Sequence, residues 1–213
     1  MSKMARYCTA GEMRTILGLP TSTTDPNYDS DQVLNFHLDQ AHHAFLGAIS
    51  ILKRDDPLTG NIDGTNTTFN TSYYPIADRD FDGTIGTLDV DVYGWGDSDD
   101  LDTKTSLAVA SVDWKEGRIK LSSPPSSTFE VITADYRYSL YEPNFDLFKQ
   151  AVAYLAGYFY FSAKYMEVPT RLRVGAAYYM GGDPTGNCWR NYLRVLSMIR
   201  SKIISKGTLK DLV

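Results

Sequence analysis

The sequence predicts an α+β protein, in which a small bundle of three to four helices carries an inserted antiparallel β sandwich or barrel. Apolar residues recur with helical spacing at both ends of the chain, whereas apolar and polar residues alternate in between. Turn-forming residues at Pro57 and Pro143 bound the alternating stretch, which predicts that its two ends lie close together. The predicted domains are a helical domain of residues 1–56 and 142–213 and a β module of residues 57–141.

The first two helices are predicted from their caps. Thr9 and Glu12 match a capping box, in which each side chain accepts from the other residue's backbone amide, and Gly18 is a suitable stop. A similar capping pattern opens a longer helix at about Asp31, which we expect to reach Lys53. Its apolar face consists of Leu34, Leu38, Ala41, Phe45, Ala48, Ile49 and Leu52.

Six short strands are predicted in the β module. Runs rich in β-branched and aromatic residues alternate with polar residues and are separated by turn residues. Strands at roughly ten-residue spacing are typical of a small sandwich or barrel. We expect them at residues 67–70, 73–76, 88–93, 107–113, 118–121 and 130–138.

The longest predicted helix covers residues 144–166. Asn144 is a good N-cap, and Asp146 lies where the helix dipole favours a negative charge. Because apolar groups extend nearly all the way round, this helix needs packing partners on several sides, either in the core or partly on another copy of the chain. Beyond it, we expect a strand or extended arm at residues 171–180 and a last helix from about residue 184 or 187 to residue 205.

Composition excludes several classes of protein. A formal net charge of -5 and a pI near 5.2 disfavour a dedicated nucleic-acid binder, whose domains are usually basic. Cys8 and Cys188 lie far apart in sequence, which predicts neither a disulfide framework nor a zinc site and favours a reducing compartment. We expect no secretory signal and no transmembrane helix, because no segment has the required apolar run.

Charge is divided along the chain. Residues 55–102 contain twelve aspartates and a single basic residue, Arg79. The chain after Gly186 contains six basic residues and a single acidic one, Asp211. Such segregation favours different partners for the two regions, although two solvated surfaces remain the simpler alternative.

The strongest local motif is an acidic loop at residues 78–89. Its spacing matches a calcium loop, with carboxylates at positions 1, 3 and 5, glycine at 6, a backbone carbonyl at 7 and an acid at 12. These positions are Asp78, Asp80, Asp82, Gly83, Thr84 and Asp89. With strands predicted on both sides, a bound Ca²⁺ is expected to have a structural role, since it cancels the repulsion between carboxylates. The alternative is an acidic turn whose side chains accept local amides.

Motifs for catalysis are absent from the sequence. It contains no glycine-rich phosphate loop, no nucleophile elbow and no histidine in a recognisable arrangement with a serine or cysteine. We therefore expect a protein that is not an enzyme.

The order of the predicted elements resembles the head-tail connector, or adaptor, proteins of tailed double-stranded DNA viruses. The resemblance covers residues 1–53 and 144–206, with the capped helix in ARYCTAGEMRTILGL, two long helices, the segment RLRVGAAYYMG and a final amphipathic helix. The short strand of that family typically carries a Val-Gly or Ile-Gly step followed by alternating Ser and Tyr. Val174-Gly175 and Tyr178-Tyr179 occupy these places here, with Ala176-Ala177 as a departure. The β module is similar to small β modules of structural proteins of tailed viruses.

The resemblance implies a structural virion protein of the neck. In that family a ring, usually of twelve copies, lies between the portal and the tail or stopper protein and leaves a channel for DNA. The implied partners are other copies of the chain, the portal and a stopper or tail-completion protein. DNA is implied only as a molecule that passes non-specifically through the channel, and no membrane is implied as a partner. The implied location is the virion neck, and the host cytoplasm during assembly. The expected portal or subunit interface consists of Arg171, Arg173, Val174, Tyr178, Tyr179, Trp189, Arg190 and Arg194.

A calcium-stabilised β binding or adhesion module is the alternative function. It predicts a secreted chain whose β module binds a glycan or protein ligand by itself. The expected lack of a secretory signal argues against it.

Overall fold

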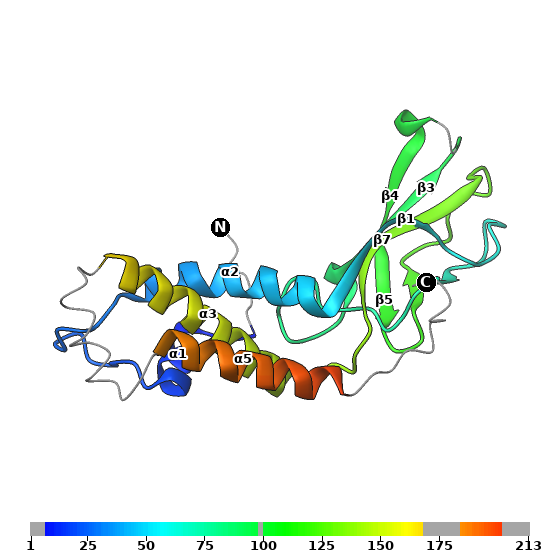
Figure 1. The fold of residues 1–213 in the computed structure, drawn as a ribbon. Helices are drawn as coiled ribbons and strands as arrows, with labels where there is room; N and C mark the ends of the chain where they lie inside the picture. The colour runs from blue at the N-terminus through cyan, green and yellow to red at the C-terminus, as the bar shows by residue number, and fades with distance from the viewer. Residues whose placement is uncertain (1–6, 98–99, 168–183, 202–213) are drawn as a thin grey trace. The chain divides into compact units, whose positions relative to one another are not determined.

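The computed structural model describes residues 7–97, 100–167 and 184–201. In these residues, four packed helices accompany a β module of two small antiparallel sheets, which confirms the predicted α+β class (Figure 1). The chain divides into two compact units. Residues 49–143 form the β unit, and the described parts of residues 6–48 and 144–202 form the helical unit.

The first helix, α1 (Ala10–Leu17), has the predicted caps. The Thr9 amide donates to the Glu12 carboxylate at 2.9 Å, and the Glu12 amide donates to the Thr9 hydroxyl at 3.3 Å. Gly18 ends the helix with φ of 65°, a left-handed conformation that glycine adopts at little cost.

The second helix, α2 (Asp31–Ile49), ends four residues before the predicted end at Lys53. The chain continues directly into β1 (Ser50–Pro57), which pairs with β7 (Val131–Ser139) and places Ile51 opposite Tyr138. The predicted end was wrong because these residues gain an inter-strand ladder. Such pairing overrides a local helical pattern.

The helical unit is built around α3 (Phe145–Glu167), which Asn144 caps by accepting from the Leu147 amide at 3.1 Å. This helix packs against α1 and against α5 (Pro184–Arg200). At Gly157, an added Cβ would lie 2.7 Å from Leu17 Cδ1 and 2.9 Å from Cys188 Sγ, so a larger residue would have to displace these side chains. The Phe45 ring of α2 also meets the Phe148 ring of α3 edge-on, with centroids 5.2 Å apart. The apolar sides of α3 therefore have partners within the chain.

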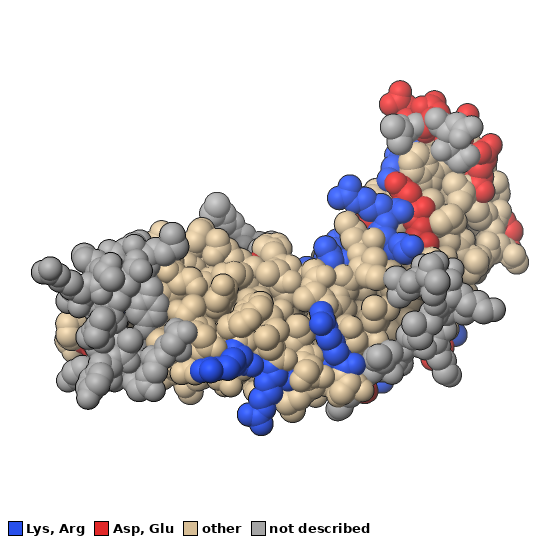
Figure 2. Space-filling view, viewed as in Figure 1, with Lys and Arg blue, Asp and Glu red and all other residues tan. Residues whose placement is uncertain are grey.

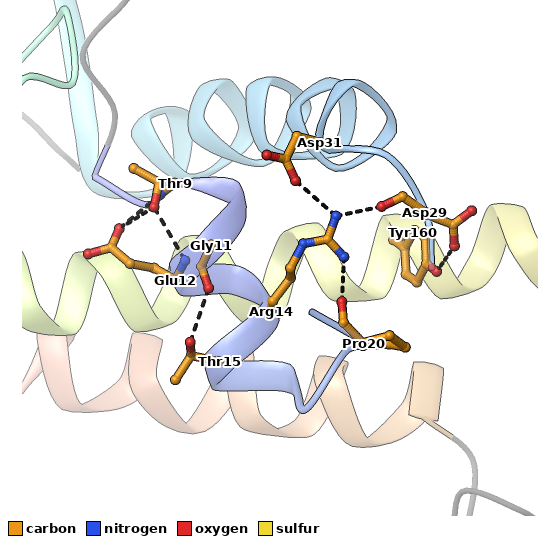
Figure 3. Close-up of polar contacts among 9 residues, drawn as sticks. All are labelled: Thr9, Gly11, Glu12, Arg14, Thr15, Pro20, Asp29, Asp31 and Tyr160. Carbon is orange, nitrogen blue, oxygen red and sulfur yellow. Dashed lines mark hydrogen bonds and ion pairs between the residues drawn. The ribbon is translucent and has the colours of Figure 1, made fainter. Parts of the chain in front are cut away.

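A buried arginine ties the loop before α2 to the helices (Figure 3). Arg14 is only 5% exposed, and its guanidinium donates to Pro20 O at 2.7 Å and to Asp29 O at 2.5 Å. It also pairs with the Asp31 carboxylate at 2.9 Å. The Asp29 carboxylate accepts from the Tyr160 hydroxyl of α3 (Figure 3). This polar network secures the loop's backbone carbonyls.

The β unit contains a four-stranded and a three-stranded sheet. The first has the order β1-β7-β3-β4, with β3 at Val90–Trp95 and β4 at Lys104–Leu107. The second has the order β2-β6-β5, with these strands at Thr68–Asn70, Arg118–Leu121 and Val109–Asp113. Short 3₁₀ turns, η1 (Thr87–Asp89) and η2 (Leu101–Thr103), precede β3 and β4.

The core of the β unit draws apolar side chains from both sheets, as expected for a small sandwich. Its most deeply buried members include Phe69 and Ile119 from the three-stranded sheet and Val92, Ile132 and Tyr136 from the four-stranded one. These side chains lie on alternate positions of their strands, so the period of two in the sequence specifies the buried face.

Two predicted strands differ from the structure. Residues 73–76 form no strand, and only Ile76 makes an isolated bridge, to Tyr138. Pro75 has no amide hydrogen to donate to a ladder. The expected strand at 107–113 is two strands in different sheets, because the chain leaves β4 at Leu107 and enters β5 at Val109. Among the described residues, no helix is long and apolar enough to cross a membrane.

Candidate metal centre

Three aspartates converge in the acidic loop that precedes β3. Asp78, Asp80 and Asp82 each offer a carboxylate oxygen, and these oxygens lie within 4.8 Å of one another. The loop folds back through left-handed residues at Phe81 (φ 65°) and Gly83 (φ 82°). Glycine adopts this conformation freely, whereas Phe81 is held there with its side chain in the interior, only 3% exposed. The group can therefore hold a metal ion, for which carboxylate oxygens are suitable ligands.

Backbone amides orient the three carboxylates. Asp78 is buried and accepts from the Phe81 amide at 2.7 Å and from the Gly83 amide at 2.8 Å. Asp80 accepts from the Asp82 amide at 3.2 Å. Asp82 accepts from both the amide and the hydroxyl of Thr84, at 2.7 Å and 2.6 Å. Since each carboxylate has about four lone-pair sites, these bonds leave capacity for a cation.

The side chains of Asp89 and Thr84 make contacts within the described loop. The buried Asp89 carboxylate accepts from the amides of Arg79 and Gly86, the latter at 2.8 Å, and so closes the base of the loop. The Thr84 hydroxyl donates to Asp82. Of the predicted metal ligands, the side chains of Asp78, Asp80 and Asp82 form the cluster. Ligation by the backbone carbonyl of Thr84 and by Asp89 stays a prediction.

The electrostatics of the loop favour a positive ion. The pKa of Asp78 is raised to about 7, chiefly by burial and then by the charges of Asp89 and Asp80, against the opposing effect of the loop amides. Burial, followed by the charge of Asp80, also raises the pKa of Asp89. The neighbouring Arg79 guanidinium pairs with Asp91 at 2.7 Å and donates to Leu88 O at 2.9 Å. A divalent ion would relieve the repulsion among these carboxylates.

The raised pKa of Asp78 predicts a dependence of stability on pH in the presence of a chelator. Its ordinary pKa is 3.8 and its folded value about 7, so the folded chain binds more protons than the unfolded chain between these values. The free energy of unfolding is therefore expected to fall as pH rises from about 4 to about 7. Asp78→Asn should flatten this slope, as measured by urea unfolding at a series of pH values.

The matched control for this experiment is Asp113→Asn, since Asp113 is exposed at the end of β5. It should leave the slope of the wild-type chain in place. Equal slopes for the wild-type chain and Asp78→Asn would contradict the assigned direction of the Asp78 shift.

Residues expected at a portal or subunit interface fall into two groups. Arg171, Arg173, Val174, Tyr178 and Tyr179 lie outside the described residues, as does the whole segment 171–180 predicted as a strand. Trp189, Arg190 and Arg194 are exposed on α5, over which Figure 2 shows basic side chains. Leu193, which was not among the expected interface residues, is also exposed, and its position four residues after Trp189 places it on the same side of the helix.

The fold and the acidic loop define a class: an α+β protein in which four packed helices accompany a two-sheet β unit with a candidate metal loop. No protein-family model, curated protein or solved structure matches the chain.

Proposed function

We propose that the chain is a structural virion protein of the neck, which forms a ring between the portal and the tail or stopper protein and leaves a channel for DNA. The observation that carries this proposal is the order of elements. Helices from both ends of the chain, α1 and α2 with α3 and α5, belong to one helical unit, and the whole β unit lies between them in sequence. This arrangement agrees with the resemblance to head-tail connectors.

The proposed interfaces use the two groups of residues at the C-terminal side of α3. The segment 171–180 adds as a strand to a neighbouring copy or to the portal, and the basic residues of α5 meet an acidic surface. Residues 49–143 carry 17 acidic side chains against 8 basic ones, a formal net charge of −9. An acidic surface of this kind at a channel lets DNA pass, because phosphates find few cations to bind.

The test is to tag the chain in cells that produce the virus encoding it, isolate its assembly and measure the stoichiometry of the co-purifying proteins. A ring-sized complex with portal and tail or stopper proteins is expected. A matched chain lacking residues 171–180 should lose the neck partners while its helical content is retained. Recovery of the tagged chain alone, or bound to cell-surface glycans, would refute the neck function.

The second candidate function is a calcium-stabilised β binding or adhesion module. It is favoured by one observation, the convergence of Asp78, Asp80 and Asp82 within 4.8 Å. In this function Ca²⁺ holds the loop before β3, and the β unit binds a glycan or protein ligand.

Calcium binding itself is testable on the purified chain. If Ca²⁺ is present at about a hundred times its dissociation constant, the free energy of unfolding should rise by about 2–3 kcal/mol. A chelator should reverse the gain, and Asp80→Asn with Asp82→Asn should abolish it, because the ion then loses two anionic ligands. The readouts are thermal unfolding and titration calorimetry.

The control variant for calcium binding is Asp113→Asn, which removes one exposed carboxylate outside the loop and should keep the full gain. An unchanged unfolding midpoint together with no heat of binding would mean that the loop is an acidic turn held by its own amides.

A further inference from the structure

The outward side of α5 presents apolar and basic residues together. We define the α5 outer face as Trp189, Arg190, Leu193, Arg194 and Met198, all of which are exposed. Trp189, Leu193 and Met198 are 40%, 44% and 47% exposed, which is high for large apolar side chains. Spacing of four residues aligns Trp189 with Leu193, and Arg190 with Arg194, in two neighbouring rows.

Trp189 is held in position by two other rings. Its indole lies 5.1 Å from the ring of Tyr158 on α3 and 5.4 Å from that of Tyr192 on α5, measured between centroids. A large side chain that is already ordered loses little conformational entropy when a partner covers it. Tryptophan and arginine are also the residue types most enriched among those that dominate binding energy. The α5 outer face thus has the composition of a protein interface.

The charge of this face is not balanced by α5 itself. The helix contains three arginines and no acidic residue. Arg190 donates to Asn187 Oδ1 of the same helix, and none of the ion pairs between described residues involves Arg190 or Arg194. A partner with exposed carboxylates would complement this surface.

The chain carries such a surface on its other unit. At the turn from β3 to β4, Asp97, Asp100 and Asp102 are exposed within six residues, and we call these three residues the β3–β4 tip. Figure 2 shows acidic side chains gathered at this end of the β unit. The β unit has a formal net charge of −9, whereas residues 6–48 and 144–202 carry 8 acidic and 10 basic side chains, a net charge of +2. The two units are therefore electrostatically complementary.

We propose that the α5 outer face of one copy docks on the β3–β4 tip of a second copy. Arg190 and Arg194 meet the carboxylates of the tip, while Trp189 and Leu193 are covered by the neighbouring chain. Each copy then uses two different surfaces, once each, which is the heterologous contact that generates a closed ring. The contact supplies the subunit interface of the ring and in that sense rests on the proposed neck function.

The test uses the purified full-length chain and sedimentation equilibrium up to the highest soluble concentration. The wild-type chain should associate, and added salt should weaken the association. Arg190→Glu with Arg194→Glu, or Asp100→Lys with Asp102→Lys, should each weaken it by about tenfold, because like charges then face each other. The chain with all four changes should recover the wild-type association, since every pair is again opposite in sign.

Two controls separate this contact from its alternatives. Arg118→Glu with Lys120→Glu makes the same change of charge on exposed positions of β6 and should leave association unchanged. Mixing the two double variants should restore association in complexes where the variants alternate, because each arginine face then meets an aspartate tip and each glutamate face meets a lysine tip. Docking of the face on the tip of its own chain would leave this mixture monomeric.

Three results would overturn the proposal. They are a wild-type chain that stays monomeric at every concentration, a mixture that does not associate, and a charge reversal on α5 that the changes at the tip fail to rescue. The last result would assign the face to an acidic surface of another protein. The neck function can fail while this contact holds. In that case the purified chain self-associates, but the tagged chain does not co-purify with portal or tail proteins.

Discussion

Replacing Gly117 by alanine is expected to lower the free energy of unfolding by about 3 kcal/mol or more. Gly117 has φ of 65° in the turn between β5 and β6, a conformation that alanine adopts at a cost. An added Cβ would also overlap Thr71 Oγ1 and lie 3.1 Å from Tyr74 Cβ. Thr71 cannot easily withdraw, because its hydroxyl donates to Gly117 O and Tyr73 O, and its amide donates to Gly117 O at 2.8 Å.

Gly64 provides the matched control for this substitution. It has a similar φ of 75°, but an added Cβ would meet only Ser127, with Cβ at 3.7 Å and Oγ at 3.9 Å, which are ordinary contacts. Gly64→Ala should therefore cost only about 1 kcal/mol, from backbone conformation alone. Urea unfolding followed by tryptophan fluorescence measures both losses, since Trp95 and Trp114 belong to the β unit. Equal losses for the two variants would show that the contact with Thr71 adds nothing to the loss of stability.

The second large effect is expected at Arg14. Arg14→Ala should lower the free energy of unfolding by about 3 kcal/mol, because the half-buried carbonyls of Pro20 and Asp29 lose their donor and the buried Arg14 side chain leaves a cavity. The Arg14 guanidinium also lies 4.3 Å from the centroid of the Tyr28 ring, so packing is lost as well. The measurement is urea unfolding followed by circular dichroism at helical wavelengths.

Two further variants separate the sources of the Arg14 effect. Arg14→Lys keeps the charge but not the planar fork that reaches two carbonyls, and should recover less than half of the loss. Asp31→Asn removes the ion pair to a carboxylate that is 64% exposed, and should cost less than about 1 kcal/mol. If Arg14→Lys were as stable as the wild-type chain, the positive charge of Arg14, and not its hydrogen-bond geometry, would account for its contribution to stability.

Local chemistry in the sequence was sufficient for several elements. The Thr9–Glu12 capping box and the Gly18 stop depend on neighbouring residues only, and α1 has the bounds they predict. The same holds for Asn144 at the start of α3. The alternate aspartates at 78, 80 and 82 could be recognised as a group because a tight loop of five residues brings them together without help from distant parts of the chain.

Elements that depend on long-range contacts could not be predicted in this way. The end of α2 at Ile49 is decided by pairing of the next residues with β7, which lies about eighty residues later in the chain. The division of residues 107–113 between two sheets follows from which neighbouring strand each half meets. The side-chain contacts of Asp89 likewise depend on amides that the folded loop brings to it.

Four features could be predicted from the sequence alone: the α+β class, the helix caps, the alternation that specifies the buried face of the strands and the spacing of the acidic loop. Each of these follows from interactions over a few residues, whose strength depends little on the rest of the molecule. Three other features become evident only in the folded chain: the burial of Arg14, the close approach of Gly117 to Thr71 and the partial exposure of Trp189. Burial and close contact are properties of segments far apart in sequence, and they exist only after those segments have packed.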